Sequence, residues 1–257
     1  MDNNRRTFLK IAGFSVALGL GGGIPLSLQA YAPEDVQYVP AESQISGKRW
    51  GMVIDTRKFT TPEDFQRVIE ACHHTHNVPD IQGNEEIKWI WTDHFEHVFP
   101  SSSNPYLAER YEQQDFLLLC NHCNNPPCVR VCPTKATFQR ADGIIMMDFH
   151  RCIGCRYCMA GCPYGSRSFN FRDPKPYVQN KNPDFPARMR GVVEKCTFCA
   201  ARLEQGQMPA CVEASNGAII FGDLSDPDAE IRKVLREHFT IRRKVELGTN
   251  PCVFYIV

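Results

Sequence analysis

The chain has no net charge and none of the sequence signatures of an active site. Its 257 residues carry 29 basic and 29 acidic side chains, and a chain without a basic excess lacks the electrostatic footprint of nucleic-acid binding. No nucleophile–base pair, phosphate-binding loop or pterin-binding signature is recognisable, and no Cys-x2-Cys-His haem attachment motif occurs. We therefore expect neither nucleic acid nor a small-molecule substrate to bind.

A hydrophobic run long enough for a membrane span is also missing. The apolar stretch 11–28 is short and contains five glycines. It follows residues 4–10 (NRRTFLK), which are typical of a twin-arginine export signal, and small residues at 30–32 offer a cleavage site. We predict that 1–32 is an export signal and that 33–257 is a periplasmic domain. A retained membrane anchor is the alternative.

Cysteine, in contrast, is abundant: the chain has 13, and eight of them form two consecutive runs. The first run is Cys120-x2-Cys123-x4-Cys128-x3-Cys132-Pro133, and the second is Cys152-x2-Cys155-x2-Cys158-x3-Cys162-Pro163. The second run has the bacterial ferredoxin spacing, and in two-cluster ferredoxins the fourth cysteine of each run ligates the other cluster. The runs therefore predict two 4Fe–4S clusters. Site 1 consists of Cys120, Cys123, Cys128 and Cys162, and site 2 of Cys132, Cys152, Cys155 and Cys158.

Other uses of these cysteines fit the spacing less well. Zinc sites need four ligands each and have no use for the prolines or for a crossed arrangement. A disulfide scaffold would suit an oxidising compartment, but disulfide frameworks do not follow this spacing and a chain of this length does not need them. A metal-binding scaffold without a redox role is the alternative from another functional class.

A third site is indicated by Cys196-x2-Cys199-x11-Cys211, which lacks a local fourth ligand. The only upstream candidate outside the two runs is Cys72, which we interpret as the last cysteine of a degenerate first run. The sequence thus predicts a third 4Fe–4S cluster, at site 3. Its ligands would be Cys72, Cys196, Cys199 and Cys211. The alternative for Cys72 is a buried structural cysteine.

A fourth site has lost its thiols together. The segment 58–71, ahead of Cys72, contains no cysteine, and Ser215 stands where the last run would place its fourth cysteine. We call these positions the vacated site, and they leave three clusters in total. The remaining thiol, Cys252, begins the strand-like run 252–257 and is expected to be structural.

Basic residues close to the predicted ligands would raise the potentials of negatively charged clusters. These residues are Arg130, Lys135, Arg151, Arg156, Arg167 and Lys195. His122, inside the first run, is expected to hydrogen-bond near a sulfur atom. For the histidines behind Cys72, which are His73, His74 and His76, a metal or haem contact is the alternative to a structural role.

The periodicity of the chain predicts an α+β fold of short strands, hairpins and surface helices. Strands are expected at 50–55 and at 252–257, with one strand or two short ones at 87–99. A hairpin is expected at 137–148, turning at 141–143, inside a ferredoxin-like unit at 116–170 that holds the two cysteine runs.

Two helices and one long loop complete the prediction. A helix should start after Thr61, at Pro62, and run from 65 to about 73, with Cys72 facing inward. Another should follow the cap at 226–228 and end at about 239. The segment 170–190 reads as a long connector, and such loops usually carry function or face a partner.

Four segments carry a resemblance to a known family over roughly residues 50–225 and the tail. They are 120–128 (CNHCNNPPC), 146–152 (MMDFHRC), 161–170 (GCPYGSRSFN) and 241–244 (IRRK). The chain resembles the periplasmic four-site ferredoxin family of DmsB, NrfC and PsrB type, the electron-transfer subunits found beside molybdopterin reductases and NrfD-type membrane proteins. Within that family it is most similar to the ferredoxin-like subunits of sulfite-reduction-associated membrane complexes.

The resemblance implies a role in electron transfer and no catalysis by the chain itself. The implied partners are an integral NrfD-type quinone-reactive membrane subunit and a periplasmic multihaem cytochrome subunit, between which the chain would relay electrons. It also implies a duplicated two-cluster fold. The alternative within this class is the electron-transfer subunit of a molybdopterin reductase for polysulfide, tetrathionate or dimethyl sulfoxide.

Overall fold

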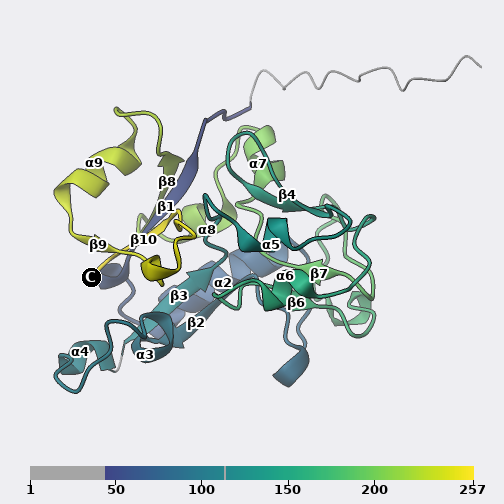
Figure 1. Ribbon diagram of the computed structural model, residues 1–257, viewed down its shortest axis with the longest axis horizontal. Coiled ribbons are helices and arrows are strands. Elements are labelled where there is room, and N and C mark those ends of the chain that lie inside the picture. Colours follow the sequence, from purple (N-terminus) through teal and green to yellow (C-terminus); the bar gives the residue numbers. More distant parts are fainter. Residues whose placement is uncertain (1–43, 113) are drawn as a thin grey trace, which may run out of the picture. The chain divides into compact units, whose positions relative to one another are not determined.

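Short strands and helices joined by long loops make up the fold in the computed structural model, which describes residues 44–112 and 114–257 (Figure 1). This mixed content agrees with the predicted α+β class. The predicted export signal, 1–32, lies outside the described residues. Among the helices within them, none is both long enough and apolar enough to traverse a bilayer.

A four-stranded sheet has the buried strand β1 (Trp50–Asp55) inside it, as predicted. β1 runs parallel to β10 and antiparallel to β8, and Met52 lies opposite both Val253 and Phe221. β9 covers the far edge of β10. The other strands of this sheet are β8 (Ile219–Asp223), β10 (Val253–Ile256) and β9 (Thr240–Ile241).

Helix α9 (Glu230–Glu237) packs on this sheet through Ile231, which is fully buried beside Val53 and Ile256. The helix is shorter than predicted. Residues 226–229 form a turn instead of the first helical turn, because the Asp226 carboxylate accepts the backbone N–H of Asp228 at 2.9 Å. The sheet and α9 lie on the opposite side of the fold from the loops around α5 and α6 (Figure 1).

A second, two-stranded sheet pairs β2 (Ile90–His94) with β3 (Asp115–Leu119). The predicted strand at 87–99 is therefore only partly correct. Residues 95–98 form the helix α3 (Phe95–Val98), because Phe95 and Val98, three residues apart, both turn into the core. The short helix α4 (Glu109–Glu112) follows before β3.

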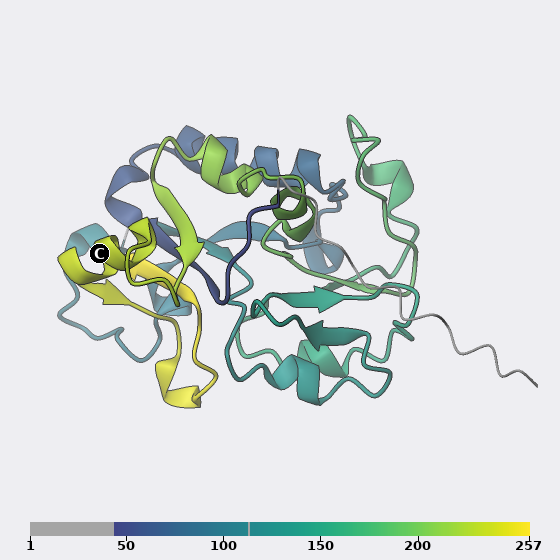
Figure 2. The same cartoon turned by 90° about the horizontal axis from the view of Figure 1, so that it is seen from above.

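Helix α2 (Pro62–Thr75) carries Cys72 on its buried face, as predicted, together with Val68. It begins at Pro62, as predicted, and ends at Thr75, slightly beyond the predicted end at about 73. Its start is fixed by Asp64, whose carboxylate accepts the backbone N–H of Thr61 at 3.1 Å. α2 packs against α8 (Ala210–Ala214), and Figure 2 shows the two helices side by side.

The cysteine loops are built from short elements. The predicted hairpin is present, and the backbone N–H of Gly143 closes its turn on the Arg140 carbonyl at 3.0 Å. The elements are α5 (Pro127–Arg130), β4 (Thr137–Gln139), β5 (Ile145–Met147), α6 (Tyr157–Ala160), β6 (Ser168–Phe169), β7 (Val193–Glu194) and α7 (Ala200–Glu204). Single 3-10 turns are η1 (Thr56–Lys58), η2 (Gly83–Glu85), η3 (Lys175–Tyr177) and η4 (Val245–Leu247).

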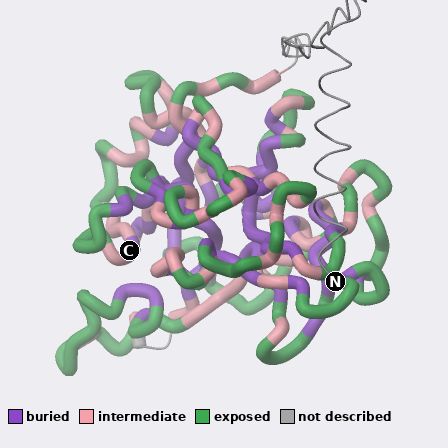
Figure 3. Tube along the Cα trace, turned by 45° about the vertical axis from the view of Figure 1, so that its right-hand side comes forward, coloured by how far each residue is buried: buried purple, intermediate pink, exposed green. Residues whose placement is uncertain are grey.

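Figure 3 shows the buried segments running through the middle, with exposed loops around them.

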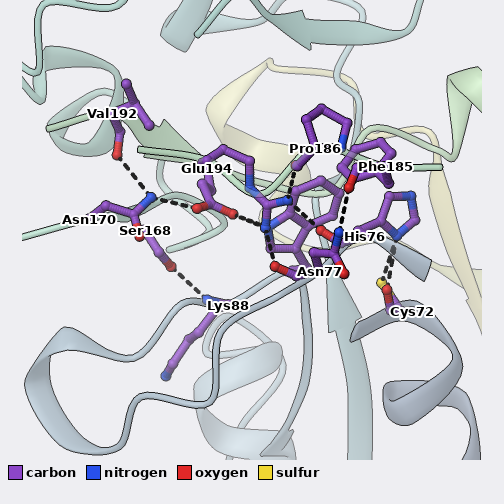
Figure 4. A network of polar contacts seen from close by, with 12 residues as sticks. Cys72, His76, Asn77, Lys88, Ser168, Asn170, Phe185, Pro186, Val192 and Glu194 are labelled. Atoms are coloured by element: carbon purple, nitrogen blue, oxygen red, sulfur yellow. Dashed lines mark hydrogen bonds and ion pairs between the residues drawn. The ribbon is translucent and has the colours of Figure 1, made fainter. Parts of the chain in front are cut away.

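The long connector at 170–190 is held by a buried ion pair. Arg188 Nη2 lies 2.6 Å from the Glu194 carboxylate, and the two side chains are 1% and 0% exposed. Trp89 Nε1 also donates to Glu194, at 2.9 Å. Arg188 in addition donates to the backbone carbonyls of His76 and Asn77 at the end of α2 (Figure 4). The pair therefore ties the connector to α2 and β2.

Removing one partner of this pair should destabilise the protein strongly. Glu194→Gln leaves the Arg188 guanidinium buried without a counter-charge, and Arg188→Met leaves the Glu194 carboxylate buried without one. Either change should lower the free energy of unfolding by about 3–5 kcal/mol. Thermal unfolding of the purified chain, followed by circular dichroism, measures the loss. The double variant should lose less than the two single losses added together. This role would be contradicted if the losses of stability in the two single variants simply added in the double variant, or if the single variants were as stable as the parent.

Candidate functional site

The four cysteines of site 1 line a single cavity. Strand β3 leads into Cys120, α5 carries Cys128, and Cys162 follows α6. Burial raises the pKa of Cys123 to about 12, and the charges of Cys120, Cys162 and Cys128 add to this rise. The predicted crossing of Cys162 from the second run to the first is thus present in the geometry.

Site 2 lies nearer the surface. Burial raises the pKa of the Cys158 thiol, and the charge of Cys152 acts in the same direction. Cys155 is exposed. At Cys132, burial is outweighed by backbone donors, above all the N–H of Thr137 at 3.4 Å from the sulfur, and the pKa falls below its ordinary value. Helices α5 and α6, which carry Cys128 and Cys158, pack against each other.

Site 3 is formed across the greatest sequence distance. All four of its cysteines are buried. Burial raises the pKa of Cys72 far above its ordinary value, and the charges of Cys196, Cys199 and Cys211 raise it further. The helix α2 thus delivers Cys72 to the group that the sequence assigned to it. The ligand roles at all three sites stay predictions. The structure brings together the cysteines of site 1 and those of site 3, and at site 2 it brings Cys152 near Cys158.

Site 1 lies close to both of the other sites. The charge of Cys120, at site 1, contributes to the raised pKa of Cys196 at site 3. The charge of Cys128, also at site 1, contributes to the raised pKa of Cys158 at site 2. Such neighbouring sites suit one-electron transfer between bound clusters, whose potentials depend on nearby charge, hydrogen bonds and exposure.

The vacated site is filled by protein. Phe59 is 6% exposed and its ring stacks on Phe65 with centroids 4.8 Å apart. Ser215 is buried; its hydroxyl donates to the Val212 carbonyl at 2.7 Å and accepts the N–H of Ile219 at 3.0 Å. Ser215 thus closes the end of α8 with hydrogen bonds that a thiol would make only weakly.

All 13 cysteines are free thiols, so the fold does not contain the disulfide scaffold weighed above. The spare cysteine, Cys252, is buried in the sheet region, and its sulfur lies 3.0 Å from Arg49 Nη2. No group of three or more His, Cys, Asp or Glu side chains in residues 44–112 and 114–257 converges as a ligand set for one metal ion.

Of the six basic residues noted near the ligands, Arg167 and Lys195 are buried and the other four are exposed. His122 is buried as well. Its Nδ1 accepts the backbone N–H of Ile145 at 3.0 Å and its ring stacks on Phe198 at 3.7 Å, so its described hydrogen bond goes to the backbone. His76 stacks on Trp89, and its Nδ1 lies 3.8 Å from the Cys72 sulfur.

Sequence reasoning missed two contributors to site 1, which are Thr249 in the C-terminal tail and Tyr164 after the second cysteine run. The Thr249 side chain hydrogen-bonds the Cys123 thiol and so opposes the rise in its pKa. Thr249 also hydrogen-bonds the hydroxyl of Tyr164, which stands beside Cys162 in the cavity of site 1. No local pattern announces these contacts, because Thr249 lies outside every cysteine run.

Known proteins are similar to this chain in sequence. The family model described as 4Fe-4S dicluster domain matches residues 113–176. The chain is 39% identical to the Hdr-like menaquinol oxidoreductase iron-sulfur subunit 1 of Archaeoglobus fulgidus, over 98% of this chain and 97% of that protein. It is 36% identical to a subunit of the tetrathionate reductase of Salmonella typhimurium, over 100% of this chain and 89% of that subunit.

It is also 43% identical to a component of the polysulfide reductase of Wolinella succinogenes, over 81% of this chain and 94% of that protein. The matches extend well beyond the dicluster segment, so the relationship concerns the whole fold and not only the two cysteine runs. The chain therefore belongs to the family of ferredoxin-like iron–sulfur subunits that transfer electrons in oxidoreductase complexes.

Proposed function

We propose that the chain is a three-cluster electron relay, with one 4Fe–4S cluster at each of sites 1, 2 and 3. The observation that carries the count is the convergence of Cys72 with the three cysteines of site 3. A structural cysteine on α2 would have no reason to meet three other buried thiols. The fold would then contain two copies of a ferredoxin-like two-cluster unit. The copy at 116–170 would hold two clusters, and the other copy would keep only the four cysteines of site 3.

The packing of the vacated site supports three clusters rather than four. The stacked rings of Phe59 and Phe65 and the hydrogen-bonded Ser215 occupy the end of α2 and α8 where a fourth cluster would need its ligands. The segment 58–71 offers this site no cysteine, and the last run offers it only Ser215. The relay would then hold three clusters, one fewer than a four-site relay.

We further propose that the relay serves a membrane-bound respiratory complex of the sulfite-reduction-associated type, in the position of its DsrO subunit. Electrons would pass between a quinone-reactive NrfD-type membrane subunit and a periplasmic multihaem cytochrome subunit. The near full-length similarity to a menaquinol oxidoreductase subunit supports this assignment, as does a second relative, the menaquinone reductase iron-sulfur cluster-binding subunit of Nitratidesulfovibrio vulgaris, which is 35% identical over 81% of this chain.

Export is part of the proposal. Residues 4–10 would direct the folded chain through the twin-arginine route, so that clusters inserted in the cytoplasm reach the periplasm intact. The second candidate function is the electron-transfer subunit of a molybdopterin reductase. The similarity to the tetrathionate and polysulfide reductase subunits favours it, and the partner chains discriminate between the two.

Purification from gently solubilised membranes tests the complex. An affinity-tagged chain should bring with it a membrane-spanning subunit and a haem protein. A reduced menaquinone analogue should then reduce the clusters, which bleaches their broad visible absorption. Recovery of a molybdopterin-containing subunit in their place would contradict the sulfite-type assignment and support the second candidate.

Substitution of Cys72 tests site 3. Cys72→Ala should lose or convert one cluster, removing up to about four irons per chain, while the signals of sites 1 and 2 persist. Cys252→Ser is the matched control, because it removes a buried thiol that belongs to no site and should leave the iron content as it was. Equal iron in the Cys72→Ala variant and the parent would show that the pairing is wrong.

Ser215→Cys tests the vacated site. A new thiol there meets no other cysteine from 58–71, so the iron and sulfide content should not change. The variant should also be slightly less stable, because the thiol replaces two good hydrogen bonds with weak ones. A gain of about four irons per chain would mean that a fourth ligand set already surrounds this position.

A further inference from the structure

Among the described residues, three buried cations have no carboxylate partner, and they are Lys195, Arg167 and Arg243. Lys195 and Arg167 lie near predicted ligand cysteines. Lys195 is 0% exposed, and its ammonium donates to the backbone carbonyls of Ile145 and Cys196, the latter at 2.7 Å. Arg167 is 5% exposed and donates through Nη1 to the Thr137 hydroxyl at 3.2 Å. No ion pair of the described residues includes either side chain.

The nearest acid in sequence does not compensate Lys195. Glu194 precedes it directly, but the Glu194 carboxylate is held by Arg188 and Trp89. In contrast, Arg202, whose charge reaches Cys199 of site 3, is paired with Glu213. A buried charge without a counter-charge is strongly disfavoured, and a negatively charged bound group would supply the counter-charge that Lys195 and Arg167 lack.

Each of the two cations lies close to two sites. Lys195 donates to the carbonyl of Cys196, a site 3 cysteine, and to that of Ile145, which lines the cavity of site 1. Arg167 lines the cavity of site 1 itself, and Thr137, to which it donates, gives its backbone N–H to the sulfur of Cys132 at site 2.

Hydrogen bonding leaves Arg167 available to such a group. Its Nη2 has no hydrogen-bond partner within bonding distance among the described protein atoms, although the side chain is almost completely buried and interacts with the thiols of Cys128 and Cys158. The other nitrogen, Nη1, is already engaged by Thr137 and by the Met147 sulfur. A free buried donor beside two thiol sites indicates that a bound group completes the environment.

Resting on the three-cluster function proposed above, we propose that Lys195 and Arg167 are shared counter-cations of the relay. Lys195 serves sites 1 and 3, Arg167 serves sites 1 and 2, and site 1 is the site that the two cations share. A fixed cation stabilises a cluster more strongly after the cluster has gained an electron, which raises its reduction potential. Both are positioning residues that act on the clusters through charge.

Redox titration of the purified, cluster-loaded chain, followed by electron paramagnetic resonance, tests the pattern of shared influence. Lys195→Met should lower the potentials at sites 1 and 3 and spare site 2. Arg167→Met should lower those at sites 1 and 2 and spare site 3. The matched control is Arg151→Met, which removes a cation next to Cys152 whose side chain is 68% exposed. Water already screens that charge, so its removal should shift the potentials much less.

The signals are assigned with Cys→Ser variants at Cys123 and Cys199, one for site 1 and one for site 3. If the Lys195→Met variant fails to assemble its clusters, the Lys195→Arg variant distinguishes loss of charge from loss of structure, because arginine keeps the positive charge. Iron lost from sites 1 and 3 in Lys195→Met but retained in Lys195→Arg supports the proposal. Loss from all three sites, or equal loss with arginine, shows a merely structural role and overturns it.

Unchanged potentials with full iron content in both methionine variants would overturn the proposal, as would equal shifts at all three sites. The result for the parent protein separates this inference from the function on which it rests. A parent without iron–sulfur signals would refute the electron-relay function. If the parent shows three signals and neither methionine substitution shifts their potentials, the proposal of shared counter-cations is refuted while the electron-relay function stands.

Discussion

The fold depends on holding buried thiols from distant parts of the chain close together. Burial and mutual repulsion raise the pKa of Cys123 and Cys196 to about 12, so neither thiol would ionise by itself near neutral pH. Metal ligands have to be deprotonated, which couples cluster binding to folding. The groups that offset this cost are backbone donors such as the Thr137 N–H and the two buried cations, Lys195 and Arg167.

The scaffold around the thiols follows from that requirement. Strand β3 leads directly into Cys120, helix α2 carries Cys72 in its last turn, and both elements are anchored in the main core. The connector at 170–190 is fixed to α2 by the Arg188–Glu194 pair. Helix α2 therefore has neighbours on two sides, α8 and the connector, and Cys72 is held rigidly enough to complete a site with cysteines more than a hundred residues away.

The cysteine spacing was the part of the sequence with the most predictive power. It anticipated the grouping of Cys162 with the first run and of Cys72 with the third, because ligand sets are short, regular and chemically constrained. The strand at 50–55 and the hairpin at 137–148 were also predictable, since each is a local pattern of apolar residues and turns.

The rest depended on contacts between distant residues. The helix at 95–98 replaced a predicted strand because its apolar side chains meet the core at helical spacing. The Arg188–Glu194 pair and the Thr249 contact to Cys123 have no local signature. Sequence proximity also could not distinguish the two buried cations from the four exposed basic residues around them, since burial is a property of the folded chain.

The number of clusters is the central claim, and elemental analysis of the intact purified protein tests it most directly. Three 4Fe–4S clusters require about twelve irons and about twelve acid-labile sulfides per chain. Eight irons would mean that Cys72 and the third run do not form a site. Sixteen irons would mean that the vacated site is occupied after all. Either result would contradict the three-cluster relay.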